Sequence, residues 1–298
     1  MIKLKDILLE DSNSDNQLVQ ANFKKITSLT NNIWKSRDVS WGDSLAKSIL
    51  GDNKLGMFNL AAAIFLLQDK QNPSIEMLSV VVSLILRESK GEVAFAQLHP
   101  KEIGAWINNY FFGGDSSRGY AQIQPSLARE YGIDPEKVET MTGSVNALYK
   151  IMTSRYNLAV KRGYKGDTVT IWNSETKTFI KIPAIGSDAA LHAAMASHNG
   201  GAGLIQKWCK TDKLGLAAPC NSTNFKKDGR ITNNNQPIQN YIPRLQSGGG
   251  ADTVTYMTQA IKSFNNIKPS ILLAFANPLK DIPKDVRRKY PLDTKNIT

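Results

Sequence analysis

The sequence has few of the residues that most often bind metals. Its 298 residues include three histidines and two cysteines, Cys209 and Cys220, and their spacing fits no zinc-finger pattern. We therefore expect neither a metal nor a cofactor. The two thiols would close a small loop in an oxidising compartment, whereas in a cytoplasmic product they would stay reduced.

Long apolar runs are also missing. The longest, LAAAIFLL at residues 60–67, is too short to cross a bilayer. The opening MIKLKDILLEDSNSD lacks the apolar core of a signal peptide, because Lys3, Lys5 and Asp6 interrupt it. We expect synthesis in the cytoplasm, with no transmembrane segment and no export signal.

Negative charge is in deficit. The chain has 37 basic and 26 acidic residues, a net charge of +11. Such a surface favours polyanions, which include nucleic acid, anionic lipid and bacterial cell-wall polymers. The densest basic cluster, KDVRRK at residues 284–289, is short, and no RNA-binding aromatic signature accompanies it. Charge alone therefore predicts no specific nucleic-acid partner.

The residue pattern predicts a mainly α chain with a small β insertion. Residues 11–35 are expected to form a loose or weakly helical lead-in. The segment after Asn265 is expected to be an extended tail, because it holds four prolines. Helices are predicted at residues 55–69, 73–90, 126–131, 144–161, 187–199 and 252–264, and a β-hairpin at 167–183.

The stretch SLILRESKG, residues 83–91, places Glu88 at the end of a helix that otherwise suits the core. Asn72 is the expected N-cap of this helix, Pro73 its first residue and Gly91 its stop. Residues 77–86 leave almost no polar face, which predicts that the helix is buried on most sides.

Glu88 lies on the apolar stripe of this helix and faces the negative end of the helix dipole. Both circumstances disfavour the charged carboxylate, and proteins use such settings to keep an acid protonated near neutral pH. Glu88 is therefore a candidate general acid. The alternative is a structural ion pair with Arg87 or Lys90 at a solvated helix end.

Three further stretches carry candidate functional residues. They are SSRGYAQIQPSLA with Gly119, Gln122, Ile123 and Pro125, then AAMASHNGGAG with Asn199, and then QNYIPRL with Tyr241 and Arg244. Each also has an ordinary structural interpretation: a turn leading into a helix, a helix C-cap and a core tyrosine, respectively.

Together with the Glu88-Ser89 pair, these motifs resemble the soluble lytic transglycosylases and the related goose-type lysozymes, which cleave the glycan strands of bacterial peptidoglycan. The family pattern is an E-S pair ending a buried helix, then G-L-M-Q-I-x-P, A-Y-N-A-G-x-G and an N-Y-V-x-x-V-like stretch. The resemblance covers roughly residues 72–250. It implies a lysozyme-like α+β domain at 72–265, with an N-terminal helical extension at 1–71 and a proline-containing tail at 266–298.

The resemblance implies a role for each matched residue. Glu88 falls on the general acid, and Ser89 on the serine that helps to orient substrate. The residues that fall on the sugar-binding groove or its motifs are Gly119, Tyr120, Gln122, His198, Asn199 and Tyr241, of which Tyr241 matches the tyrosine that hydrogen-bonds the catalytic carboxyl.

The chain departs from the family pattern in three places. Tyr120 and Ala121 replace the usual Leu and Met, and His198 stands where the family usually has Tyr. A histidine there can titrate near neutral pH and make activity pH-sensitive. About thirty residues separate Glu88 from Gly119, more than is typical of the family, which predicts an enlarged groove wall.

The implied reaction cleaves the β-1,4 bond between N-acetylmuramic acid and N-acetylglucosamine. Glycosidases usually need a proton donor and a second carboxylate. In a lytic transglycosylase, the substrate's own N-acetyl group and 6-hydroxyl replace that carboxylate, so Glu88 alone acts as acid and then as base and a 1,6-anhydromuramyl product forms.

Three other functions remain open. Goose-type lysozymes hydrolyse with water and an extra aspartate, and Asp115 is the candidate, although it lies only four residues before Gly119. A non-catalytic cell-wall-binding or virion module is the second, and nucleic-acid binding through the basic surface is the third. Without an export signal, a wall-degrading enzyme would reach the periplasm or the wall by phage lysis, from a virion or through a secretion apparatus.

Overall fold

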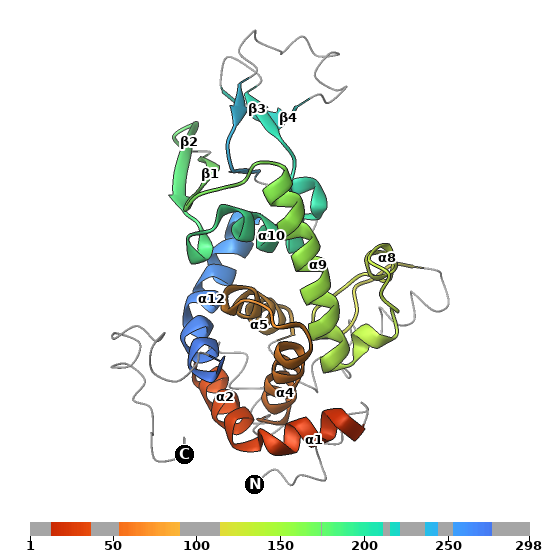
Figure 1. The fold of residues 1–298 in the computed structure, drawn as a ribbon. Helices are drawn as coiled ribbons and strands as arrows, with labels where there is room; N and C mark the ends of the chain where they lie inside the picture. The colour runs from red at the N-terminus through yellow and green to blue at the C-terminus, as the bar shows by residue number, and fades with distance from the viewer. Residues whose placement is uncertain are drawn as a thin grey trace. The chain divides into compact units, whose positions relative to one another are not determined.

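The computed structural model describes residues 13–36, 54–89, 114–173, 175–210, 215–220, 236–243 and 253–275. The fold is mainly helical, with two small three-stranded sheets (Figure 1). The chain divides into two compact units, which we call the first unit (residues 1–146 and 263–298) and the second unit (residues 147–262). These units do not coincide with the domain boundaries expected at residues 72 and 265.

The N-terminal part of the first unit is helical. Its helices are α1 (Asn13–Ala21), α2 (Phe23–Ser36) and α4 (Lys54–Gln71), and both α1 and α2 contact α4. Residues 11–35 were expected to be a loose or weakly helical lead-in; residues 13–21 and 23–36 are helical, so the helical alternative is confirmed and the loose one was wrong. Ile26, Leu29 and Ile33 form an apolar stripe on α2 and are almost completely buried, because they pack at helical spacing against the apolar α4.

Helix α5 (Ile75–Ser89) follows α4 after a short turn. The predicted N-cap, Asn72, was wrong. Asn72 has a positive φ of 44° and accepts a side-chain hydrogen bond from Gln68 (2.7 Å), so it terminates α4 instead. Ser74 caps α5, because its hydroxyl oxygen accepts the Met77 N–H at 3.2 Å. The predicted stop at Gly91 lies outside the described residues.

The C-terminal helix α12 (Thr253–Phe275) continues beyond the predicted end at residue 264. Pro269 lies inside it, so the extended tail predicted from residue 266 was wrong as far as residue 275. Burial explains why the helix tolerates the proline: Ile267 and Ile271 are fully buried, and the Phe275 ring lies 4.6 Å from the Phe65 ring. Residues 276–298 lie outside the described part.

The rest of the first unit contains α8 (Pro125–Glu130), the 3₁₀ turn η2 (Lys137–Glu139) and the first residues of α9 (Met141–Lys161). Both α8 and α9 confirm the helices predicted at 126–131 and 144–161. The unit boundary lies within α9, after Asn146.

The second unit holds both sheets. In the first sheet, β1 (Thr168–Asn173) pairs antiparallel with β2 (Thr178–Pro183) and parallel with β6 (Tyr241–Ile242). The predicted hairpin at 167–183 is therefore confirmed. The second sheet, β4 (Ala217–Pro219), β3 (Trp208–Lys210) and β5 (Pro237–Ile238), was not predicted, so the β structure is more than one hairpin insertion.

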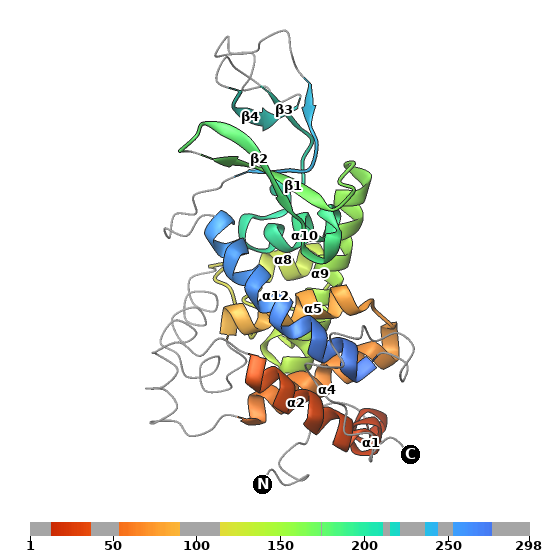
Figure 2. The same ribbon diagram turned by 90° about the vertical axis from the view of Figure 1, so that its left-hand side faces the viewer.

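Helix α10 (Ala189–Gly200) packs against β1 and against the short 3₁₀ turn η4 (Ala202–Leu204). Asp188 caps it by accepting the Ala190 and Leu191 N–H groups, and Gly201 follows it with a φ of 75°. This confirms the helix predicted at residues 187–199. Figure 2 shows the β1–β2 hairpin between α10 and the second sheet, which contains β3 and β4.

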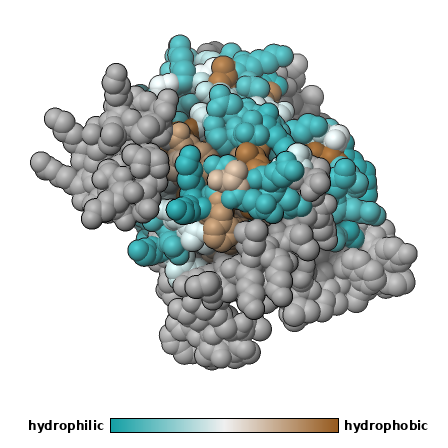
Figure 3. Space-filling view, turned by 60° about the horizontal axis from the view of Figure 1, so that its bottom comes forward, coloured by the Kyte–Doolittle hydropathy of each residue, from teal (hydrophilic) through white to brown (hydrophobic). Residues whose placement is uncertain are grey.

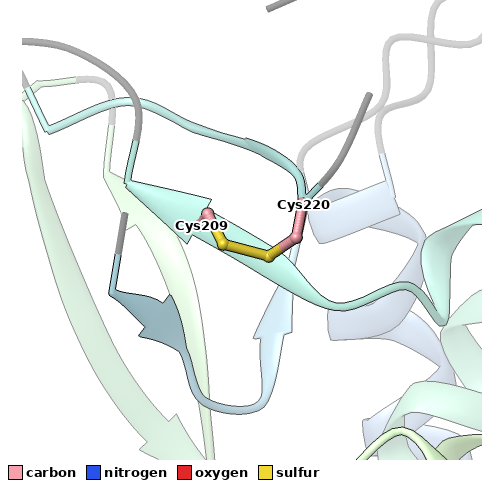
Figure 4. Close-up of a disulfide and its surroundings, with 2 residues drawn as sticks. All are labelled: Cys209 and Cys220. Carbon is pink, nitrogen blue, oxygen red and sulfur yellow. A yellow bond between two sulfur atoms is a disulfide. The ribbon is translucent and has the colours of Figure 1, made fainter. Parts of the chain in front are cut away.

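A disulfide joins Cys209 on β3 to Cys220, the residue directly after β4 (Figure 4). It closes the short connection between two paired strands, so the structure has the two thiols oxidised. A bond of this kind persists in oxidising compartments and is rare in the cytoplasm.

On the face shown in Figure 3, the described residues are mostly polar, with small, separate hydrophobic areas among them. Within the described segments, the large hydrophobic residues that are exposed are Val160 and Leu216. No helix there has both the length and the apolar character that a bilayer crossing requires.

Candidate catalytic residues

Glu88 and Ser89 form the end of α5, as predicted. Residues 77–86 are all buried, whereas Arg87 and Glu88 are both half-buried. Ser89 is 4% exposed, and its hydroxyl donates to the carbonyl oxygen of Ile85 at 3.0 Å. The Glu88 carboxylate therefore lies at the margin of an apolar core, at the end of a helix that is buried along most of its length.

The segment from Arg118 to Ile123 forms a tight loop. The backbones of these two residues exchange N–H···O hydrogen bonds of 3.0 Å in both directions. Gln122 has a positive φ of 49°, and its side-chain amide donates to the Gly119 carbonyl at 3.0 Å. The glutamine that the family pattern assigns to substrate thus also closes this loop onto itself.

Ser144 on α9 anchors the same loop within the first unit. Its hydroxyl accepts the Tyr120 N–H at 3.1 Å and donates to the Val138 carbonyl. Tyr120 is only 4% exposed, and burial raises the pKa of its phenol. The family resemblance implies that Tyr120 binds substrate. Because the ring is buried, packing in the core already accounts for it without a ligand.

Asp115 has a structural partner at the start of α8. Its carboxylate accepts the backbone N–H of Ser126 at 2.7 Å and the hydroxyl of the same residue. Pro125 occupies the first position of α8, where its missing N–H has no cost. Asp115 therefore acts as a helix cap, using both carboxylate oxygens.

His198 and Asn199 lie in the last turn of α10 in the second unit, and both are half-buried. Arg155 on α9, which the sequence did not single out, is 2% exposed and donates from Nη1 to the carbonyl and the hydroxyl of Ser197. A guanidinium at this position satisfies a carbonyl at the helix end and opposes the negative end of the dipole. Arg155 thus fixes the backbone directly before His198.

Tyr241 on β6 is 6% exposed and lies in a cluster of aromatic rings. The rings of Phe179 and Trp208 each lie 5.4 Å from it, both nearly edge-to-face, and Trp172 lies 4.9 Å from Phe179. Burial raises the pKa of Tyr241 to about 12, so the phenol stays protonated across the physiological range. The Tyr164 hydroxyl donates to the Tyr241 carbonyl at 2.7 Å.

The predicted site residues are divided between the two units. The loop with Gly119, Tyr120 and Gln122 and the helix end with Glu88 and Ser89 belong to the first unit. The last turn of α10 and Tyr241 belong to the second unit. That these groups form one site stays a prediction from the sequence. In the described segments, no cluster of three or more histidine, cysteine or carboxylate side chains has the arrangement of a metal site.

Comparison with known proteins adds no relative: the chain matches no family model, no curated protein and no solved structure.

Proposed function

We propose that the protein is a peptidoglycan lytic transglycosylase with Glu88 as its single acid and base. The observation that carries this proposal is the position of Glu88: a half-buried carboxylate in the last turn of a helix in which residues 77–86 are all buried and only Arg87, also half-buried, separates them from Glu88. The C-terminal end of a helix favours cations, so a carboxylate there gains no stabilisation from the helix dipole.

The other motifs support the proposal through their order and local structure. The G-x-x-Q stretch forms a closed loop, and the loop's backbone conformation is set by two residues with positive φ, Gly119 and Gln122. Asn199 lies in the last turn of α10, which ends at Gly200, and the Tyr241 ring packs edge-to-face against its aromatic neighbours. Each is a rigid setting of the kind that positions a catalytic or binding group.

The proposed reaction is balanced without a second carboxylate. Protonated Glu88 gives its proton to the glycosidic oxygen as the bond from that oxygen to the muramyl C1 breaks. The 6-hydroxyl of the same muramyl residue then attacks C1 and passes its proton to Glu88, which regenerates the acid. The products are a new 4-hydroxyl end and a 1,6-anhydromuramyl end.

The geometry of Asp115 favours this route over hydrolysis. Its two carboxylate oxygens are both engaged by Ser126 at the start of α8, so a role as water-activating base would require breaking this cap. The disulfide between Cys209 and Cys220 supports action outside the cytoplasm, in the periplasm or from a virion. Phage lysis or virion components are the partners that such a route implies.

One digestion tests the proposal. Purified peptidoglycan is incubated with the protein in ¹⁸O-labelled water, and the soluble products are analysed by mass spectrometry. We expect anhydromuramyl ends, lighter than hydrolysed ends by one water and free of label. Label at the new muramyl end would show a hydrolase and make Asp115→Asn the next variant to test. Intact glycan strands would refute the enzymatic proposal and favour a cell-wall-binding module.

A further inference from the structure

The two units differ strongly in charge. The second unit, residues 147–262, holds 15 basic and 6 acidic residues, a net charge of +9. The remaining residues hold 22 basic and 20 acidic residues, a net charge of +2. Most of the chain's net charge of +11 therefore belongs to one unit, and an anionic polymer is attracted to that unit far more than to the other.

Lysines of the second unit are available to such a polymer. Three ion pairs of the described residues, Lys70–Asp15, Arg118–Glu139 and Lys268–Glu76, lie in the first unit. By contrast, Lys181 and Lys210 are exposed and have no ion pair with any described carboxylate.

These two lysines share a local arrangement. On β2, Phe179 and Lys181 are two residues apart, and on β3, Trp208 and Lys210 are two residues apart. Because side chains alternate along a strand, each aromatic residue and its lysine lie on the same face. The Phe179 and Trp208 rings both contact the Tyr241 ring at 5.4 Å, so two aromatic-x-lysine strands from different sheets converge on one tyrosine.

This arrangement suits a glycan that carries acidic groups. The C–H faces of pyranose rings pack against aromatic side chains, and half-buried rings such as Phe179 and Trp208 offer an apolar edge beside polar surface. A lysine two residues along each strand places an ammonium group beside each ring, where it can pair with a carboxylate.

We infer that the aromatic-x-lysine surface, formed by Phe179, Lys181, Trp208 and Lys210 around Tyr241, binds the peptidoglycan strand through its sugar rings and the carboxylates of its stem peptides. The choice of glycan over nucleic acid rests on the proposed function. The surface lies entirely within the second unit, so its binding is measurable separately from the chemistry of Glu88.

The test uses the full chain with Glu88→Gln, so that bound strands are not cleaved. The probe is a set of soluble peptidoglycan strands released from purified sacculi by sonication, either native or with their carboxylates converted to amides. The test variant adds Lys181→Gln and Lys210→Gln. The matched control adds Lys150→Gln and Lys161→Gln, two exposed lysines on α9 whose loss changes the net charge equally.

We expect the test variant to bind native strands about tenfold more weakly, the scale of two exposed ion pairs, and the control less than about twofold more weakly. Amidated strands should bind the parent as weakly as native strands bind the test variant. Equal losses in test and control variants would show attraction by diffuse charge and overturn the inference. Tighter binding of single-stranded DNA, weakened by the same variants, would also overturn it and assign the surface to nucleic acid.

The outcome is separable from the proposed function. If Glu88→Gln still digests the probe strands, the assignment of Glu88 fails, while the comparison of lysine variants can be repeated with amidated and native strands at short times. If wild-type protein yields anhydromuramyl products but the lysine variants bind normally, only the binding surface is refuted.

Discussion

The backbone of Gly119 lies directly against the carbonyl of Val138. A Cβ atom built on Gly119 would approach the Val138 oxygen to 2.0 Å, and the φ of Gly119 is +69°. Both facts require glycine at this position, whatever the loop binds. The close approach joins the G-x-x-Q loop to η2, so the rigidity of the candidate groove motif depends on a residue without a side chain.

Replacement of Gly119 by alanine should therefore destabilise the protein. We expect Gly119→Ala to lower the free energy of unfolding by about 3 kcal/mol, because it adds backbone strain and a clash with a main-chain oxygen. Gly203→Ala is the control, since the nearest atom to its added Cβ would be a flexible Gln206 nitrogen at 3.7 Å. The control should change the free energy of unfolding by no more than about 0.5 kcal/mol. Urea denaturation measures both variants. Equal effects would contradict the clash.

Glu88→Gln should preserve folding but reduce wall-degrading activity at least about a hundredfold, which is the usual scale for loss of a general acid. Glu76→Gln is the matched control, because this carboxylate lies in the first turn of the same helix and pairs with Lys268 at 2.9 Å. Release of soluble fragments from purified peptidoglycan measures both variants. A Glu88→Gln protein that clears walls at the wild-type rate would remove the basis for the catalytic assignment.

Tyr241→Phe separates a hydroxyl role from a packing role. The ring contacts with Phe179 and Trp208 need no hydroxyl, whereas the family resemblance implies that the hydroxyl holds the catalytic carboxyl. We expect activity to fall by about tenfold or more, the scale of a lost hydrogen bond to a charged group, with an unchanged melting temperature. A lower melting temperature with full specific activity would make Tyr241 structural only.

His192 predicts how stability depends on pH. It is 1% exposed on α10, its Nδ1 accepts the Ile185 N–H, and burial lowers its pKa to about 4. The unfolded chain binds this proton below about pH 6.5, whereas the folded chain binds it only below about pH 4. The contribution of neutral His192 to the free energy of unfolding is therefore fully present above pH 6.5, and it is lost as the pH falls from 6.5 to 4.

The free energy of unfolding that is lost through protonation of His192 should approach about 3 kcal/mol at the acid end of this pH range. Urea denaturation between pH 4.5 and 7.5 measures it. In His192→Asn, the side-chain oxygen can replace Nδ1 as acceptor but cannot titrate, so this variant should be less stable at neutral pH and show a flatter pH dependence. An unchanged slope would mean that other groups control acid unfolding.

Elements with a strong local pattern could be predicted from the sequence. The alternation in TVTIWN and TFIKIP was enough to place the β1–β2 hairpin, and the apolar run of α5 was enough to place that helix. The segment of helix α2 was predicted only as a loose or weakly helical lead-in, because its buried residues are few among many polar ones. The second sheet was missed because its strands are two or three residues long, and β3 pairs with β5 across more than twenty residues of sequence.

The motifs of the candidate site could be recognised in the sequence, but the tertiary contacts that hold these motifs in place could not. No local pattern distinguishes Arg155 from a surface arginine, yet it holds the end of α10. The cap that Asp115 provides for α8 and the contact of Gly119 with Val138 depend on residues 11 and 19 positions away along the chain. Such tertiary constraints decide whether a conspicuous residue serves structure, chemistry or both.

The last prediction concerns the end of α12. The prolines after Asn265 predicted an extended tail, but α12 continues to Phe275 and buries Ile267 and Ile271 completely. A chain ending at Asn266 should therefore lose several kcal/mol of stability, since removal of one buried isoleucine side chain costs about 2–5 kcal/mol. A chain ending after Phe275 retains these contacts and should therefore melt at a higher temperature than the chain ending at Asn266.

Two point substitutions on α12 test the same packing without truncation of the chain. Ile271→Ala should lower the melting temperature clearly, whereas Leu272→Ala, at the adjacent half-buried position, should lower it less. If the chain ending at Asn266 melts like the full chain, the packing of α12 does not stabilise the first unit. If that chain folds but cannot cleave soluble glycan strands, the end of α12 contributes to the reaction itself, because stability alone would then not account for the loss.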